Sequence, residues 1–247
     1  YHFNLIDMVA IKNKKKYPKI RIKNLMIKKN KKILAIIPAR IGSKGLKKKN
    51  LRKIGKKSLV EYSVDIAKKS NYINKIAVST DSSLIQKIAM QNNVWCKKLR
   101  PKKYATDKSS THKAIKFVID NIDYKPDLII ELHPTYIFRK FTTIDKAIEK
   151  LIKKRKSDSL ISIRKIDDTS HPDFVINLSN DYINYKNSPI KFNRHYLKPK
   201  YRSLGYILIS KIDSFNKTKS MLGNNCIGFE IRDDTEIIDI NNLLDFK

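Results

Sequence analysis

The side chains best suited to chemistry lie in a short cationic loop near the start of the chain, residues 40–50. An apolar run directly before it, residues 33–37, is short enough for a fully buried strand. Pro38 ends that run, because proline has no N–H to donate to a sheet. Glycine lets backbone N–H groups turn toward a phosphate, and cationic side chains neutralise its charge. We therefore predict an anion site at the carboxyl end of a sheet, formed by Arg40, Gly42, Ser43, Lys44, Gly45, Lys47, Lys48, Lys49 and Asn50.

The motifs of several common sites are missing from the sequence. The loop reads G-S-K-G, which fits neither G-x-x-x-x-G-K-[ST] nor the dinucleotide motif G-x-G-x-x-G. No G-x-S-x-G elbow of a hydrolase is present, and His112 and His171 do not have the spacing of zinc ligands.

Three more polar loops follow predicted strands, at residues 80–81, 100–111 and 133–139. Loops at the carboxyl ends of parallel strands meet at one edge of the sheet. A carboxylate, Asp239, lies near the end of the chain on a predicted strand. Cations hold phosphate oxygens and a carboxylate holds a hard cation, so this combination suits a nucleoside triphosphate with Mg²⁺.

The hydrophobic pattern alternates between strands and helices. Helices are expected after Ser58 and Ser82, over 114–122, and after Thr142, where Asp145 would complete a capping box. This alternation predicts an α/β fold with a mostly parallel, doubly wound sheet and right-handed crossovers. The expected strands cover 33–37, 75–81, 94–97, 127–132, 159–166, 206–209, 226–231 and 236–240.

Two parts of the chain break the alternation. Residues 167–201 are polar and aromatic with three prolines, and an inserted hairpin or arm is expected there. Residues 1–31 carry cationic runs with little apolar periodicity and are expected to be a solvated tail or not native, which leaves one domain over residues 32–247.

The formal net charge of +31 raises the possibility of a nucleic-acid partner. Lysine far outnumbers arginine and is spread along the whole chain, whereas specific nucleic-acid sites favour clustered arginine with interleaved aromatic residues. A compositional bias toward lysine, isoleucine and asparagine is the favoured interpretation, with nucleic-acid binding kept as an alternative.

Cysteine usage and hydropathy bear on location. Cys96 and Cys226 form no C-x-x-C pair and no disulfide framework, which favours a reducing cytoplasm. No apolar run approaches the ~20 residues needed to span a bilayer, so no membrane association is expected.

The polar loops resemble, in order, those of the cytidylyltransferases that activate sialic acid and related nonulosonic acids with CTP. The resemblance covers Lys32 to Phe246. The first loop, I-I-P-A-R-x-G-S-K-G followed by K-N, matches that family better than it matches the related 3-deoxy-manno-octulosonate synthetases. The other similar stretches are V-S-T-D at 78–81, L-R-P at 99–101, A-T-D-K-S-S at 105–110, L-H-P-T-Y-I-F-R at 132–139, H-P at 171–172, Y-R-S-L-G at 201–205 and I-D-I-N-N-L-L-D-F at 238–246.

The resemblance implies a fold of the nucleotide-diphospho-sugar transferase type and a homodimer joined through the arm. It also implies attack of the anomeric hydroxyl of a sugar acid on the α-phosphate of CTP, with release of pyrophosphate. Arg40, Lys49 and Asp239 would be catalytic, and Asp239 with Asn241 would hold Mg²⁺. Arg40, Ser43 and Lys49 would hold the triphosphate, Asn50, Arg100, Ser109 and Thr111 would surround the cytidine, His133 would face the sugar acid, and Lys44, Arg139 and Arg202 would complete the substrate site.

Three residues depart from the family pattern. Asn241 replaces the second aspartate of D-I-D, which weakens a metal site, and His133 replaces the glutamine of Q-P-T. Leu204 replaces the asparagine of N-G and removes a polar group near the expected sugar pocket. A relative that binds nucleotide with little turnover is therefore a second alternative.

Overall fold

The computed structural model describes residues 31–43, 45–175, 177–184 and 197–246. The predictions for the basic tail and for Lys44 lie outside this range, apart from Lys31. A six-stranded sheet forms the centre of the molecule, with strand order β10-β6-β9-β5-β1-β4. Its strands are β1 (Ile33–Pro38), β4 (Lys75–Ser79), β5 (Leu128–Glu131), β6 (Ser159–Lys165), β9 (Tyr201–Lys211) and β10 (Cys226–Glu230).

Five of these strands are parallel, and β9 runs antiparallel to its neighbours β5 and β6. The predicted α/β class with a mostly parallel sheet is thus confirmed. β1 is wholly apolar and buried from Ile33 to Ile37 because strands cover both of its edges and helices cover both of its faces.

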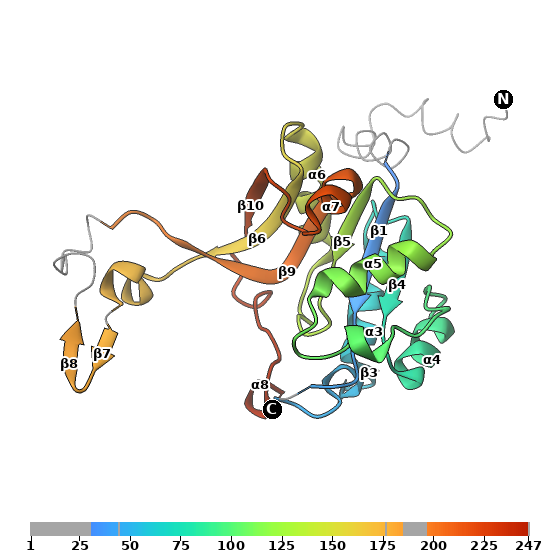
Figure 1. The fold of residues 1–247 in the computed structure, drawn as a ribbon, viewed down its shortest axis with the longest axis horizontal. Coiled ribbons are helices and arrows are strands. Elements are labelled where there is room, and N and C mark those ends of the chain that lie inside the picture. The colour runs from blue at the N-terminus through green and yellow to red at the C-terminus, as the bar shows by residue number, and fades with distance from the viewer. Residues whose placement is uncertain (1–30, 44, 176, 185–196, 247) are drawn as a thin grey trace, which may run out of the picture.

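Helices cover the two faces of the sheet (Figure 1). One layer consists of α3 (Leu59–Lys69), α4 (Ser83–Gln91) and α6 (Phe141–Lys153), whose apolar sides share a core with Ile33 and Ile130. The other layer consists of α5 (Thr111–Asn121) and α7 (Ile212–Thr218), which pack on Leu34 and Ile129. The remaining elements are the hairpin β2 (Lys53–Ile54) and β3 (Lys57–Ser58), the single turns Lys49–Leu51, Lys102–Tyr104, Asp168–Ser170 and Pro172–Phe174, and α8 (Leu243–Phe246).

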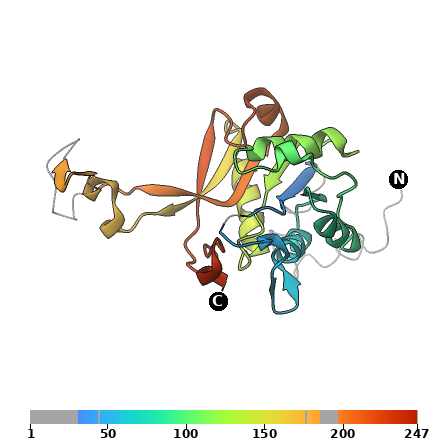
Figure 2. The same cartoon turned by 60° about the horizontal axis from the view of Figure 1, so that its bottom comes forward.

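An arm projects from the sheet between β6 and β9 (Figures 1 and 2). Its far part contains the antiparallel hairpin of β7 (Asn177–Ser179) and β8 (Tyr182–Asn184). None of the described helices is long and apolar enough to cross a membrane.

Helix starts were predicted with mixed success. Ser58 and Glu61 form a capping box at α3, and the Ser82 side chain accepts a hydrogen bond from the amide of Ile85. The capping box predicted at Thr142 and Asp145 is wrong, because α6 begins at Phe141 without a side-chain cap. The Asp145 carboxylate instead accepts a 2.5 Å hydrogen bond from Ser70, so a buried tertiary contact replaces the local one.

Two strand predictions are also wrong. Residues 94–97 form only an isolated bridge between Ala77 and Trp95. Residues 236–240 form a turn and an extended segment outside the sheet, held by side chains and by backbone hydrogen bonds from Glu236 to Asp233 and from Ile240 to Thr135. Their apolar pattern reflects packing, since Ile240 is buried in a small cluster with Leu46, Leu59 and Ile137.

The end of the chain packs tightly on the first loop. A Cβ atom added to Gly45 would lie 2.5 Å from the backbone oxygen of Asn241, whereas one added to Gly42 would meet nothing within 4 Å. The absence of a side chain at Gly45 therefore lets the last segment pack closely against the loop. Its position in a cationic loop had instead suggested a role in binding phosphate.

We predict that Gly45→Ala lowers the free energy of unfolding by about 1–3 kcal/mol, because the Asn241 backbone must move to admit the methyl group. Gly42→Ala is the matched control and should change it by less than about 0.5 kcal/mol. Urea denaturation of both variants measures the difference. Equal stability of the two variants would contradict the proposed close packing.

Candidate functional site

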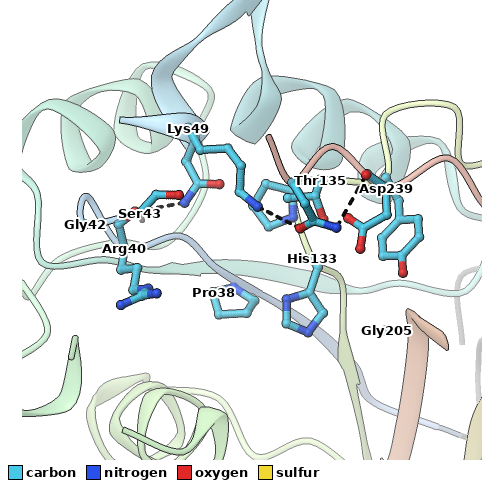
Figure 3. A pocket seen from close by; sticks show the side chains of 13 residues that line it. Pro38, Arg40, Gly42, Ser43, Lys49, His133, Thr135, Gly205 and Asp239 are labelled. Atoms are coloured by element: carbon cyan, nitrogen blue, oxygen red, sulfur yellow. Dashed lines mark hydrogen bonds between the residues drawn. The ribbon is translucent and has the colours of Figure 1, made fainter. Parts of the chain in front are cut away.

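Two adjoining cavities open at the carboxyl ends of β1 and β5. The larger has a volume of about 370 Å³ and the smaller about 230 Å³. Pro38, Arg40 and His133 line both of them, so these residues mark the junction. The larger cavity is also lined by Gly42, Ser43, Lys49, Asn50, Pro134, Thr135, Tyr136, Gly205, Asp239 and Asn241 (Figure 3). The smaller is also lined by Arg100, Tyr104, Thr106, Asp107, Ser109, Ser110, Thr111 and Ala114.

The first loop is held in place by two side chains. The Asp81 carboxylate accepts a 2.9 Å hydrogen bond from the amide of Ile41, and Asn50 donates a 2.8 Å bond to the carbonyl of Arg40. The Arg40 guanidinium itself lies 2.5 Å from the Asp107 carboxylate, which belongs to the loop of the smaller cavity. Arg40 is thus a fixed cation between the two cavities.

Lys49 supplies a second cation to the larger cavity. Its amine donates a 3.1 Å hydrogen bond to the side-chain oxygen of Asn241 (Figure 3). Burial lowers the pKa of Lys49, and the negative charge of Asp239 offsets this only in part. The positive charge of Arg40 also lowers that pKa, so a bound anion would stabilise the charged form of Lys49.

Asp239 lies in the larger cavity and is contributed by the last segment of the chain. One of its carboxylate oxygens, Oδ1, is buried and has no hydrogen-bond partner among the described residues. The other groups near it include Tyr136, whose pKa is raised to about 12 by burial and by the neighbouring Asp239 carboxylate. A buried carboxylate oxygen without a partner is a free ligand position for a cation.

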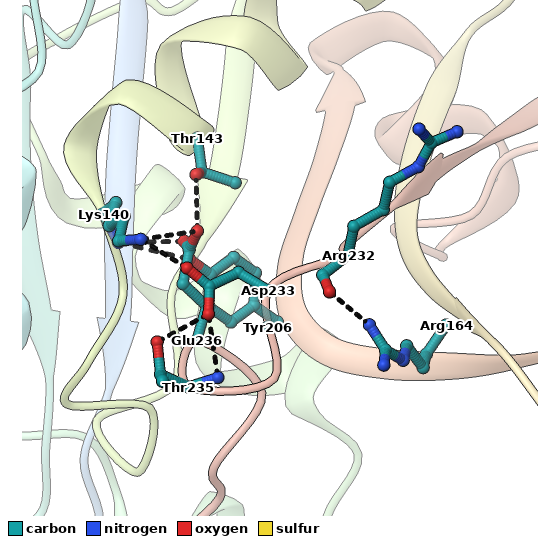
Figure 4. A network of polar contacts seen from close by, with 8 residues as sticks. All are labelled: Lys140, Thr143, Arg164, Tyr206, Arg232, Asp233, Thr235 and Glu236. Carbon is teal, nitrogen blue, oxygen red and sulfur yellow. Dashed lines mark hydrogen bonds and ion pairs between the residues drawn. The ribbon is translucent and has the colours of Figure 1, made fainter.

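A polar network anchors the segment that carries Asp239 (Figure 4). The carboxylate of Glu236, which is 4% exposed, accepts hydrogen bonds from the Tyr206 hydroxyl, from the backbone amide of Lys140 at 3.1 Å and from the Thr143 hydroxyl at 3.0 Å. Asp233 pairs with the Lys140 side chain. The segment is therefore tied to the start of α6 and to β9.

The smaller cavity is also polar. Arg100 is 5% exposed, and its Nε atom has no hydrogen-bond partner in the described part of the chain. Burial lowers the pKa of Arg100, with Asp81 acting in the opposite direction. Ser109 donates a 2.8 Å bond to the carbonyl of Lys103, and Thr111 is the first residue of α5. These groups can bind a flat polar ring by hydrogen bonds to its edge.

The structure brings most predicted site residues together at these cavities, with some differences. Asn50 lines the larger cavity and not the smaller one, where it was expected to surround the cytidine. Arg202 is exposed on β9 and lines neither cavity. Leu204 is buried in the core, and Gly205 lines the larger cavity beside it.

Arg139 also lines neither cavity and is 2% exposed. Its guanidinium lies 5.6 Å and 5.0 Å from the ring centres of Tyr136 and Tyr206, and it donates a 2.9 Å hydrogen bond to the carbonyl of His133. Burial lowers its pKa to about 10. Arg139 thus fixes the loop that carries His133, and its predicted direct contact with substrate stays a prediction.

Three residues of the site were given no role in the prediction from the sequence: Tyr136, Asp107 and Glu131. Glu131 ends β5 and is 2% exposed, and its carboxylate lies 2.9 Å from the Nε2 atom of His133. The sequence does contain a signal that could have pointed to Glu131: this glutamate interrupts the otherwise apolar run L-I-I-E-L two positions before His133.

Comparison with known proteins places this geometry in a family. The chain is 31% identical over 220 residues to an N-acylneuraminate cytidylyltransferase of Escherichia coli O18:K1:H7, covering 87% of this chain and 51% of the relative. It is 39% identical over 137 residues to a CMP-N,N'-diacetyllegionaminic acid synthase of Legionella pneumophila, covering 54% of this chain and 58% of the relative. The chain thus spans about half the length of these relatives.

A solved structure of CMP:2-keto-3-deoxy-manno-octonic acid synthetase complexed with CTP has the same fold. It superposes with a TM-score of 0.66 at 15% identity, covering 85% of this chain and 93% of that one. The model of the cytidylyltransferase family matches residues 34–243, which include every residue that lines the two cavities. The chain belongs to the cytidylyltransferase family.

Proposed function

We propose that this protein transfers CMP from CTP to the anomeric hydroxyl of a nonulosonic acid such as N-acetylneuraminate and releases pyrophosphate. One observation supports this most strongly: a cationic cavity and a polar cavity meet at Arg40 and His133 in a chain of the cytidylyltransferase family. The acid is taken from the relatives, whose names refer to N-acylneuraminate and to N,N'-diacetyllegionaminic acid.

The triphosphate would occupy the larger cavity. Arg40 and Lys49 neutralise its charge, and the Ser43 hydroxyl and the open backbone at Gly42 face the same space. The cytidine would occupy the smaller cavity, where Arg100, Ser109 and Thr111 offer hydrogen-bonding groups. Catalysis then consists mainly of positioning and of stabilising charge that develops on the phosphates.

A divalent cation, Mg²⁺, fits the acidic side of the larger cavity. No group of three or more His, Cys, Asp or Glu residues in the described ranges could hold a metal ion by itself. Mg²⁺ is commonly held by one or two carboxylates together with substrate phosphates and water. Asp239, with its unpartnered Oδ1, and Asn241 would hold it, and the cation would neutralise the triphosphate.

The arm is the proposed contact with a second copy of the chain. Val175, Leu178 and Tyr201 on it are 71%, 68% and 48% exposed. Large apolar side chains exposed on a projecting arm suit a protein interface. We expect light scattering to give a dimer mass, and a monomer mass at micromolar concentration would contradict this.

We predict pyrophosphate release when the protein is incubated with CTP, Mg²⁺ and a panel containing N-acetylneuraminate and N,N'-diacetyllegionaminic acid. Release should require the acid, should be lost with EDTA, and should be much slower with ATP, GTP or UTP. Folded protein that binds CTP in calorimetry without releasing pyrophosphate would instead be a relative with little turnover. Failure to bind CTP, with tight DNA binding at physiological salt, would favour the nucleic-acid alternative.

We also predict that Lys49→Met weakens CTP binding by roughly 10–100-fold, the loss expected when one charge-assisted contact to a phosphate is removed. Lys47→Met is the matched control, because Lys47 is exposed and lines neither cavity. Its dissociation constant for CTP should stay within about twofold, as is usual for an exposed side chain. Equal weakening by both substitutions would indicate an effect of net charge and not of the cavity.

A further inference from the structure

His133 occupies a special place in the cleft. If one CTP molecule fills both cavities, its α-phosphate lies at their junction, because that phosphate links the nucleoside to the rest of the triphosphate. Three described residues line both cavities: Pro38, Arg40 and His133. Arginine stays protonated and proline has no ionisable side chain, so His133 alone of these three can accept a proton.

A buried carboxylate lies directly behind this histidine. Glu131 and His133 are two positions apart at the end of β5, where alternate residues face the same side. The Glu131 side chain is 3% exposed, that of His133 is 34% exposed, and their Oε1 and Nε2 atoms lie 2.9 Å apart. Oε1 of Glu131 has no hydrogen-bond partner among the described residues, so the two groups are in close charge contact without a formed hydrogen bond. In the tautomer that carries its proton on Nε2, Nδ1 retains the lone pair that can take another.

The position of the ring is fixed by its surroundings. The backbone carbonyl of His133 accepts hydrogen bonds from Arg139 at 2.9 Å and from Ser63 at 3.3 Å. Gly205 on β9 lies against the ring, because a Cβ atom added there would lie 3.5 Å from its Cδ2 atom. A methyl group at this position would make ordinary van der Waals contact with the imidazole.

The charges around His133 are mixed. Arg40 shares both cavities with it, and Lys49 and Asp239 line the larger cavity. Arg139 lies beneath its carbonyl, while α5 and β9 contribute the uncharged Thr111, Ala114 and Gly205 to the cavity walls. Glu131 is thus the negative group in contact with the ring itself, and it can stabilise the imidazolium formed when the ring takes a proton.

We propose that His133 is the general base of the transfer and that Glu131 is its positioning residue. The inference depends on the function proposed above. The acceptor's hydroxyl oxygen forms a bond to the α-phosphorus, and the bond from that phosphorus to the bridging oxygen of pyrophosphate breaks. The hydroxyl proton passes to Nδ1 of His133, and pyrophosphate leaves with the bonding electron pair.

The test compares His133→Gln and Glu131→Gln with wild type by steady-state kinetics and CTP calorimetry. Glutamine can orient a hydroxyl but cannot take its proton, so His133→Gln should lower kcat by roughly 100-fold, the effect of losing general-base catalysis. Glu131→Gln should lower kcat by about 10-fold, and both variants should bind CTP within about threefold of wild type.

Glu149→Gln is the matched control, because Glu149 is on α6 outside both cavities, and its kcat should match wild type. If His133→Gln does not fold, His133→Ala should regain turnover when imidazole is added. An unchanged kcat in His133→Gln would overturn the base role, and so would a change confined to a higher KM for the acid. In either case, turnover by the wild-type protein would still support the proposed function. No pyrophosphate from wild type with any acid would overturn both.

Discussion

The cleft depends on one buried carboxylate, Glu236, which ties the end of the chain to the body of the domain. Lys49 and Asn241 are separated by 192 positions, yet their side chains form a hydrogen bond. This contact requires the last segment to pass over the first loop, and that segment belongs to no sheet. Hydrogen bonds from Tyr206, Lys140 and Thr143 to Glu236 supply the order that a strand ladder would otherwise give.

The charges of the cleft differ in kind from the charge of the whole chain. Most of the +31 net charge comes from lysines along the sequence, many of them solvated. Burial lowers the pKa of both Lys49 and Arg100, and each loses solvation that a polyanion could replace. The site is therefore marked by a half-buried lysine and a buried arginine in its loops, which net charge does not reveal.

The sequence predicted what local patterns encode and missed what distant contacts decide. The buried β1, the caps at Ser58 and Ser82, and the polar loops at strand ends follow from short-range rules, and the structure has them. The helix start at Thr142 and the strand over 236–240 were wrong because partners far away in the sequence bind Asp145 and Glu236. Spacing alone likewise could not show that Arg139 is buried between two tyrosine rings or that Glu131 contacts His133.

The central claim is that the two cavities together hold one CTP molecule with its α-phosphate at their junction. The most direct measurement is a crystal structure of the full chain with Mg²⁺ and a CTP analogue whose α,β-bridging oxygen is replaced by a methylene group. We predict cytosine beside Arg100 and Thr111, the terminal phosphates beside Lys49, and the α-phosphate between Arg40 and His133. A nucleotide bound in the reverse direction, or outside these cavities, would contradict the account.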